Sequence, residues 1–177
     1  MAGRTALLVP VPEAEAIVGD LRARHDPSAT VGVPAHVTAL FPFLPGDEID
    51  ETVERSLRDL FGAQPPFAYR FASVGRFAHN VHLMPESGAQ FSRLTAALAA
   101  RWPDHLPYEG VFDVVIPHLT AADQVDPDTA DAISDELERR LAESGPVIGR
   151  AHELWLVREG TQGHWSTVAH FALGAAS

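Results

Sequence analysis

Two short segments of this 177-residue chain pair a histidine with a threonine two positions later: His36-Val37-Thr38 and His118-Leu119-Thr120. Alternate residues of a β-strand point to the same side of its sheet, so each segment would present an imidazole and a hydroxyl together. A neutral imidazole can take a proton from a nucleophile, and a protonated imidazole can give one to a leaving oxygen. Threonine hydroxyls can donate hydrogen bonds to phosphoryl oxygens. Together the two segments indicate acid–base cleavage of a phosphodiester without a metal ion.

The position of the two segments strengthens this interpretation. With nine histidines in the chain, about 0.5 His-x-Thr segments are expected by chance, so a single copy would carry no information. The two copies lie 82 residues apart. The helices and strands predicted below repeat with nearly the same shift, which places both segments at equivalent points of a duplicated pattern.

The elements that must position these residues follow from hydrophobic periodicity. Apolar residues at helical spacing predict four helices, over Pro12–His25, Glu48–Phe61, Ser87–Trp102 and Thr129–Ser144. Runs rich in β-branched and aromatic residues predict seven strands, over Arg4–Val9, His36–Phe43, Phe67–Val74, Asn80–Met84, Val111–Thr120, Arg150–Arg158 and Trp165–Leu173. The order strand, helix, strand, helix, strand occurs twice.

The repeated order predicts one α+β domain over residues 1–177 with a duplicated two-lobe fold. The lobes would span approximately residues 1–76 and 77–177, with a strand able to cross from one lobe to the other. Antiparallel or mixed sheets would line a central cleft, and helices would cover the outside. Facing lobes would then bring the two imidazoles and the two hydroxyls around one cleft.

Composition excludes several classes of function. The chain has no cysteine, so disulfide scaffolds, thiol nucleophiles and cysteine-ligated metals are ruled out. Its net charge is −11 and its 13 basic residues are all arginine, which argues against binding of long duplex nucleic acid but not against a pocket for one phosphate. No apolar run is long enough for a membrane span, and Pro10 interrupts the first apolar stretch too early for a signal peptide. We expect a soluble, cytoplasmic monomer.

The two segments extend to His36-Val37-Thr38-Ala39-Leu40-Phe41-Pro42 and Pro117-His118-Leu119-Thr120-Ala121-Ala122. In these residues, and along nearly the whole chain, the sequence resembles the two-histidine (2H) phosphoesterase superfamily, in its 2′-5′ RNA ligase-like branch. The resemblance implies two pseudo-symmetric lobes around a cleft and metal-independent opening of cyclic phosphodiesters, often 2′,3′-cyclic nucleotide ends. It also implies that His36 and His118 are catalytic, that Thr38 and Thr120 hold the phosphate, and that no metal or cofactor is used. The expected partner is a small nucleotide or an RNA end.

One departure from the family concerns charge. Many members carry an arginine five residues after the second histidine, where this chain has Asp123. A carboxylate in place of a cation argues against RNA ligation and against binding of long RNA. The sequence leaves open which histidine is the acid, and what the physiological substrate is.

Two other functions stay open at this point. The cleft could bind a phosphorylated nucleotide without turning it over, or His79 and His82 could join nearby carboxylates in a metal-dependent hydrolase. Against the second, residues three apart on a strand point to opposite faces, and the acidic clusters fit helix N-termini better than a metal site. Three aromatic residues could stack on a nucleobase: Phe43, Tyr108 and Trp165.

Overall fold

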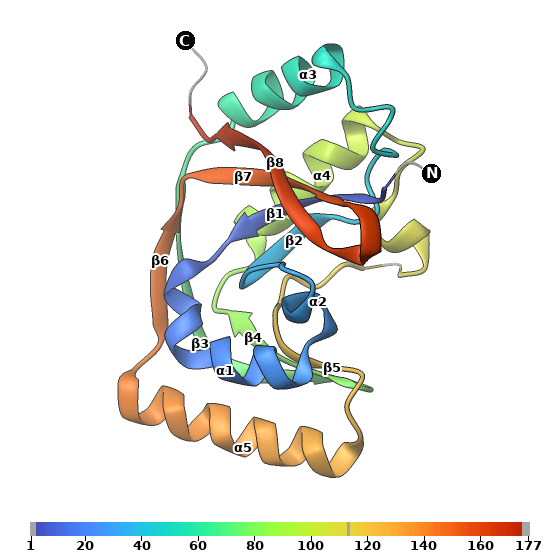
Figure 1. The fold of residues 1–177 in the computed structure, drawn as a ribbon. Coiled ribbons are helices and arrows are strands. Elements are labelled where there is room, and N and C mark those ends of the chain that lie inside the picture. The colour runs from blue at the N-terminus through green and yellow to red at the C-terminus, as the bar shows by residue number, and fades with distance from the viewer. Residues whose placement is uncertain (1–2, 113, 175–177) are drawn as a thin grey trace.

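The chain folds into two antiparallel sheets with helices packed around them (Figure 1), seen here in a computed structural model that describes residues 3–112 and 114–174. The first sheet has the strand order β2 (His36–Leu40), β1 (Thr5–Pro10), β7 (Glu153–Glu159) and β8 (Trp165–Ala172). The second has the order β5 (Leu119–Asp123), β4 (Asn80–Pro85), β3 (Phe67–Phe77) and β6 (Val147–Ala151). The predicted α+β two-lobe fold is confirmed.

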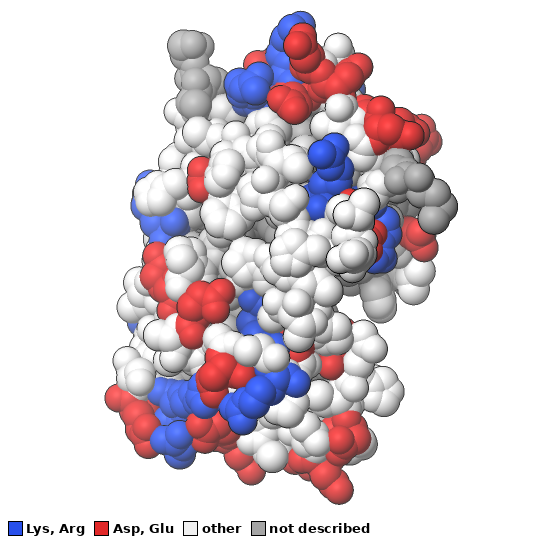
Figure 2. Space-filling model, viewed as in Figure 1, with Lys and Arg blue, Asp and Glu red and all other residues white. Residues whose placement is uncertain are grey.

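The α-helices of the described residues are α1 (Glu15–His25), α2 (Pro27–Thr30), α3 (Glu51–Gly62), α4 (Ala89–Arg101) and α5 (Pro127–Ser144). Three short 3₁₀ turns are η1 (Pro12–Ala14), η2 (Pro107–Gly110) and η3 (Thr161–Gly163). None of these helices is both long and apolar enough to cross a bilayer. Charged side chains gather over α3 and α5 on the face drawn in Figure 2, where arginines lie among acidic residues.

Several of the acidic residues serve as helix caps. The carboxylate of Asp50 accepts hydrogen bonds from the backbone amides of Thr52 and Val53 at the start of α3. Asp26 and Asp126 cap α2 and α5 in the same way. These bonds satisfy amide groups that a helix N-terminus otherwise leaves without partners. Asp50 and Asp126 belong to the acidic clusters of the sequence, so part of that clustering has a capping role.

The sheets do not divide at residues 76 and 77 as the predicted lobes would. The first sheet takes strands from both ends of the chain and the second takes them from the middle, while β3 itself spans the predicted boundary. The predicted strand Arg150–Arg158 is wrong, because β6 and β7 separate at His152 and enter different sheets. The chain therefore crosses from one sheet to the other at that residue.

Both His-x-Thr segments lie at equivalent sheet edges. Strands β2 and β5 are both edge strands. Among the described strands, β2 pairs only with β1, and β5 pairs only with β4. The middle residues Val37 and Leu119 are buried in the core. Helix α4, which follows β4 of the second sheet, packs against β2 of the first sheet. Helix α1, which follows β1 of the first sheet, packs against β5 of the second sheet. The Thr95 hydroxyl reinforces one contact by donating to the Ala39 carbonyl oxygen at 2.8 Å.

The second segment differs from prediction in one respect. The strand predicted over Val111–Thr120 begins only at Leu119, so His118 precedes β5 instead of lying within it. Proline at position 117 has no amide to donate to a sheet. The apolar side chains before it are largely exposed, with Val111 at 73% and Val114 at 74%, so they do not form the buried face that a strand of this composition requires.

Candidate active site

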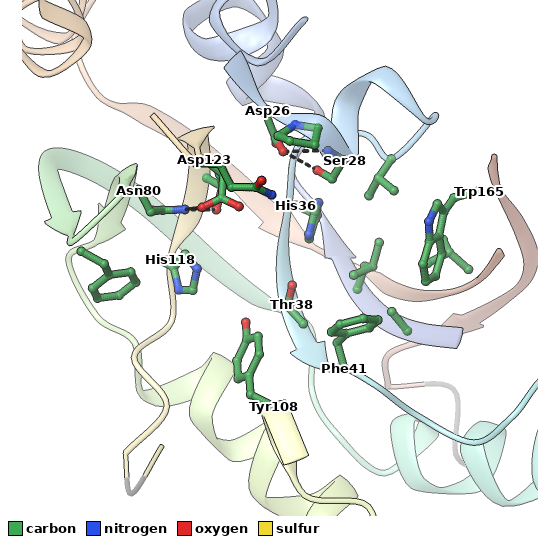
Figure 3. A pocket seen from close by; sticks show the side chains of 18 of the residues that line it. Asp26, Ser28, His36, Thr38, Phe41, Asn80, Tyr108, His118, Asp123 and Trp165 are labelled. Atoms are coloured by element: carbon green, nitrogen blue, oxygen red, sulfur yellow. Dashed lines mark hydrogen bonds between the residues drawn. The ribbon is translucent and has the colours of Figure 1, made fainter. Parts of the chain in front are cut away.

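A cavity of about 1090 Å³ lies between the two sheets. Residues of β1, β2 and β7 line one side, and residues of β4 and β5 with the segment before β5 line the other. All four residues singled out in the sequence, His36, Thr38, His118 and Thr120, line this one cavity. Figure 3 labels three of them, His36, Thr38 and His118. The structure therefore brings together two imidazoles and two hydroxyls whose positions in the sequence are 82 residues apart.

The two imidazoles are held in the same way. Nδ1 of His36 lies 2.7 Å from the carbonyl oxygen of Pro34, and Nδ1 of His118 lies 2.8 Å from that of Ile116. A carbonyl oxygen only accepts hydrogen bonds, so Nδ1 carries the proton in both rings. In a neutral ring Nε2 then holds the lone pair, and it is the nitrogen left to meet a ligand. Both rings are therefore oriented for proton transfer through Nε2.

The surroundings of the two rings differ in charge. Burial lowers the pKa of His36 to about 4; the Pro34 carbonyl opposes this shift, the positive charge of Arg22 adds to it, and the carboxylate of Asp26 opposes it. Burial also lowers the pKa of His118, but the Ile116 carbonyl and the nearby carboxylate of Asp123 both act against it. Desolvation disfavours the charged imidazole, whereas a neighbouring carboxylate favours it. Each ring therefore has a carboxylate nearby, but Asp26 is paired with Arg22, whereas the described residues give Asp123 no arginine partner.

A third imidazole lies behind His118. His82 in β4 is 2% exposed, and its ring centroid is 5.2 Å from that of His118 and 4.4 Å from that of Phe77. Burial lowers the pKa of His82 to about 4, and the adjacent His118 contributes to this shift. A buried neutral ring in this position packs against His118 from the side away from the cavity. From the sequence, His82 was a candidate only for the metal-dependent alternative and not for the two-histidine site.

Asn80 links His82 to the hydroxyl of Thr120. Nδ1 of His82 lies 2.9 Å from Oδ1 of Asn80, and the Nδ2 amide of Asn80 donates to Oγ1 of Thr120 at 3.2 Å and to Oδ1 of Asp123 at 3.3 Å. Since Oγ1 of Thr120 accepts one of these bonds, its own proton can be donated to a ligand in the cavity. Asn80 is thus placed to orient the Thr120 hydroxyl.

Replacing Asn80 by alanine is expected to lower kcat/KM about 10-fold, because the Thr120 hydroxyl, which the sequence predicts to hold a phosphate, then loses the group that orients it. If Asn80 acts through Thr120, the same replacement in a Thr120→Val background should cause no further loss, a non-additivity that double-mutant kinetics measure directly. Additive losses, with each variant folded as judged by thermal unfolding, would contradict a positioning role.

A tyrosine supplies a further hydroxyl on the other side. Tyr108 lines the cavity from η2, with its hydroxyl directed toward Thr38 (Figure 3). The backbone amide of Tyr108 donates to the carbonyl oxygen of Phe41 at 2.6 Å, which ties η2 to the end of β2. Tyr108 and Glu109 have φ of 51° and 56°, a left-handed conformation that costs non-glycine residues energy. The strained turn is what carries Tyr108 into the cavity.

The apolar end of the cavity contains two aromatic rings and an arginine. The rings of Phe41 and Trp165 meet edge to face at 6.1 Å, and the guanidinium of Arg4 lies 5.7 Å from each ring centroid. Of the three aromatics proposed to stack on a base, Trp165 and Tyr108 line the cavity. Phe43 does not, because it is buried in the core against Trp102.

The described part of the chain offers no ligand set for the metal-dependent alternative. Among residues 3–112 and 114–174, no three His, Asp or Glu side chains gather closely enough to hold a metal ion. His79 is exposed and His82 is buried behind His118, with its Nδ1 committed to Asn80. Asp26, another acidic residue of the cavity wall, bonds to Arg22 and Ser28.

Comparison with known proteins gives a consistent result. Residues 10–163 match the model of the 2′-5′ RNA ligase superfamily. A predicted phosphoesterase of Bacillus licheniformis is 25% identical over 177 residues, which covers 96% of this chain and 97% of the relative.

Solved structures show the same fold at lower identity. The protein TT0787 of Thermus thermophilus superposes with a TM-score of 0.63 at 20% identity, covering 98% of this chain and 100% of that chain. E. coli LigT complexed with 3′-AMP superposes with a TM-score of 0.59 at 19% identity, covering 98% and 99%. E. coli LigT complexed with NADP⁺ gives 0.58 at 20% identity, covering 97% and 98%.

Proposed function

Because this chain belongs to the 2′-5′ RNA ligase superfamily, we propose that it is a metal-independent phosphodiesterase. Its substrate would be a cyclic phosphodiester of the 2′,3′ type, or a 2′-5′ phosphodiester, on a nucleotide or short RNA end. His36 and His118 would perform general acid and base catalysis, and Thr38 and Thr120 would hold the phosphate. The observation that carries the proposal is the placement of both His-x-Thr segments on one cavity, with Nδ1 of each ring bonded to a backbone carbonyl.

The proposed reaction on a cyclic phosphodiester is a hydrolysis. One imidazole takes a proton from water through Nε2 as the water oxygen bonds to phosphorus. The bond from phosphorus to one ribose oxygen breaks, and the second imidazole gives its proton to that oxygen. The product is a phosphomonoester beside a free hydroxyl. The hydroxyls of Thr38 and Thr120 donate to the non-bridging oxygens, on which negative charge increases in the transition state.

The charges around the two rings support an assignment of roles. His36 is more suited to be the base, because burial keeps its ring neutral with a lone pair on Nε2, and the nearby charges of Arg22 and Asp26 form an ion pair and oppose each other. His118 is more suited to be the acid, because the carboxylate of Asp123 favours its protonated form.

The lining of the cavity and the ligands bound by proteins of the same fold both support a nucleotide substrate. The aromatic rings of Phe41 and Trp165 could contact a base. Structures with the same fold include LigT complexed with 3′-AMP, with ATP and with NADP⁺. A cavity of about 1090 Å³ has room for a nucleotide.

The test is a panel of nucleoside 2′,3′-cyclic phosphates and 2′-5′ dinucleotides, assayed for turnover in excess EDTA. We expect at least one class to be hydrolysed, with a rate unchanged by the chelator and a bell-shaped dependence on pH. Loss of activity in EDTA, restored by a divalent metal, would contradict the proposed mechanism. Tight binding of a cyclic nucleotide without product would instead support a binding protein.

A further inference from the structure

The charges on the cavity wall are unusual for a site that takes phosphates. Among the described residues that line it, Arg4 is the one permanent cation, whereas Asp26, Asp123 and Glu159 are carboxylates. Sites for several phosphates are typically lined by arginines, lysines or helix N-termini in excess of carboxylates. The wall of this cavity has the opposite balance.

Arg4 is already engaged by one of these carboxylates. Its Nε donates to Oε2 of Glu159 at 2.8 Å and its Nη2 donates to Oε1 at 3.0 Å, a bidentate pair. The same guanidinium lies against the rings of Phe41 and Trp165. A phosphate that approached Arg4 would therefore meet the charge of Glu159 as well, and would compete for a guanidinium that already has an anion.

The two aspartates differ in how their charge is compensated. Asp26 is 3% exposed; its Oδ2 accepts a hydrogen bond from Nε of Arg22 at 3.0 Å and lies 3.0 Å from Nη2 in the same ion pair. Asp123 is half-buried, and the side-chain donor that it has in the structure is the neutral amide of Asn80. No arginine of the described residues forms an ion pair with Asp123. Its charge is therefore in excess within the cavity.

The remaining wall on the side of the first sheet is uncharged. It consists of the side chains of Ala6, Leu8, Val31, Val33, Val157 and Trp165. The part of a substrate that extends away from the two histidines toward this wall meets apolar and aromatic surface, which favours an uncharged group. On the outside, the face shown in Figure 2 has arginines interspersed with acidic residues and no continuous basic surface for a polyanion.

From this balance we infer that the cavity selects a substrate with a single phosphodiester charge and rejects one that carries additional phosphate groups. The preferred class is a nucleoside cyclic monophosphate, or a similar cyclic phosphodiester with an uncharged aromatic or apolar substituent, over a phosphorylated oligonucleotide end. The inference rests on the proposed function and narrows its substrate class. Asp123 and Glu159 are the residues that set the selection.

The experiment compares two substrates that differ in one group: adenosine 2′,3′-cyclic phosphate and the same compound with a 5′-phosphate. We expect kcat/KM to be about 10-fold or more lower for the 5′-phosphorylated compound, because its extra charge enters a cavity with excess negative charge. Asp123→Asn keeps the shape and the acceptor for Asn80, and Glu159→Gln releases Arg4. Each should reduce the ratio of the two kcat/KM values several-fold.

The ratio, and not either rate, is the readout, because loss of the Asp123 charge also alters His118 and affects both substrates alike. Asp135→Asn is the matched control, since Asp135 is an exposed carboxylate of α5 that does not line the cavity. Equal kcat/KM for the two substrates, or a ratio that Asp123→Asn and Glu159→Gln leave unchanged, would overturn the inference. If neither compound is hydrolysed, the proposed function fails. In that case the dissociation constants of the two compounds are measured by calorimetry. Weaker binding of the 5′-phosphorylated compound, with a difference that Asp123→Asn and Glu159→Gln reduce, would support the charge selection, and equal binding would overturn it.

Discussion

Replacing His36 or His118 by alanine is expected to lower kcat on a cyclic phosphodiester by about 10²–10⁴-fold. Each ring lines the cavity with Nδ1 bonded to a backbone carbonyl, so each supplies one proton-transfer group through Nε2. When either ring is removed, water must carry out one of the two proton transfers in its place. His152→Ala is the matched control, because His152 is exposed at the junction of β6 and β7, outside the cavity. Wild-type turnover in both single variants would refute the two-histidine mechanism.

A substrate with a better leaving group separates the acid from the base. A phosphodiester that releases a nitrophenolate needs little protonation of its leaving oxygen, so the variant that lacks the acid should recover most of its rate on it. With His118 as the acid, His118→Ala should gain much more than His36→Ala from this change of substrate. The reverse pattern would exchange the two roles and leave the two-histidine mechanism intact.

Acid is expected to destabilise the fold between about pH 6.5 and pH 4, a window set by His36 and His82. Burial lowers the pKa of each to about 4 from the ordinary value of 6.5. In this window the unfolded chain binds protons that the folded chain does not, so the free energy of unfolding falls as pH falls. The loss is at most about 3.5 kcal/mol for each imidazole, since one pKa unit is worth about 1.4 kcal/mol. Urea unfolding at a series of pH values measures it.

The residue responsible can be identified from the slope. His82→Gln removes one titrating ring and keeps an amide near Asn80, so the variant should lose less stability than the wild type between pH 6.5 and pH 4, whatever its stability at neutral pH. His170→Gln serves as the control, since this exposed imidazole lies near Glu153 at the surface. An unaltered slope in His82→Gln would show that His82 is not a source of the acid sensitivity.

The sequence was sufficient to predict the cavity residues whose positions follow from strand alternation and from the repeated order of elements. Alternation along a strand turns His36 and Thr38 to one side and Val37 to the core, and the repeat of that pattern brought His118 and Thr120 to the same cavity. It was also sufficient for the two-lobe α+β fold, because the order of helices and strands repeats.

The residues that the sequence did not reveal depend on tertiary contacts. His82 lies across from Thr120 in the β4–β5 register, and only that pairing places it behind His118. The spacing Asn80-x-His82 resembles the same-face pattern of the two recognised segments and could have pointed to this pair. Tyr108 was a candidate for base stacking, but its position beside Thr38 depends on a turn with positive φ that the sequence pattern does not predict. The crossing at His152 arises because β6 pairs with β3 in the second sheet and β7 pairs with β1 in the first, and these pairings are tertiary contacts.

That crossing affects the order in which the protein can assemble during translation. Strand β1 is made among the first residues of the chain, yet its second neighbour β7 spans Glu153–Glu159. Until the ribosome has released those residues, one edge of β1 has no partner, and exposed edges of this kind invite pairing with other chains. A nascent chain that stalled before residue 153 would contain both histidines but would lack the strands that complete the first sheet.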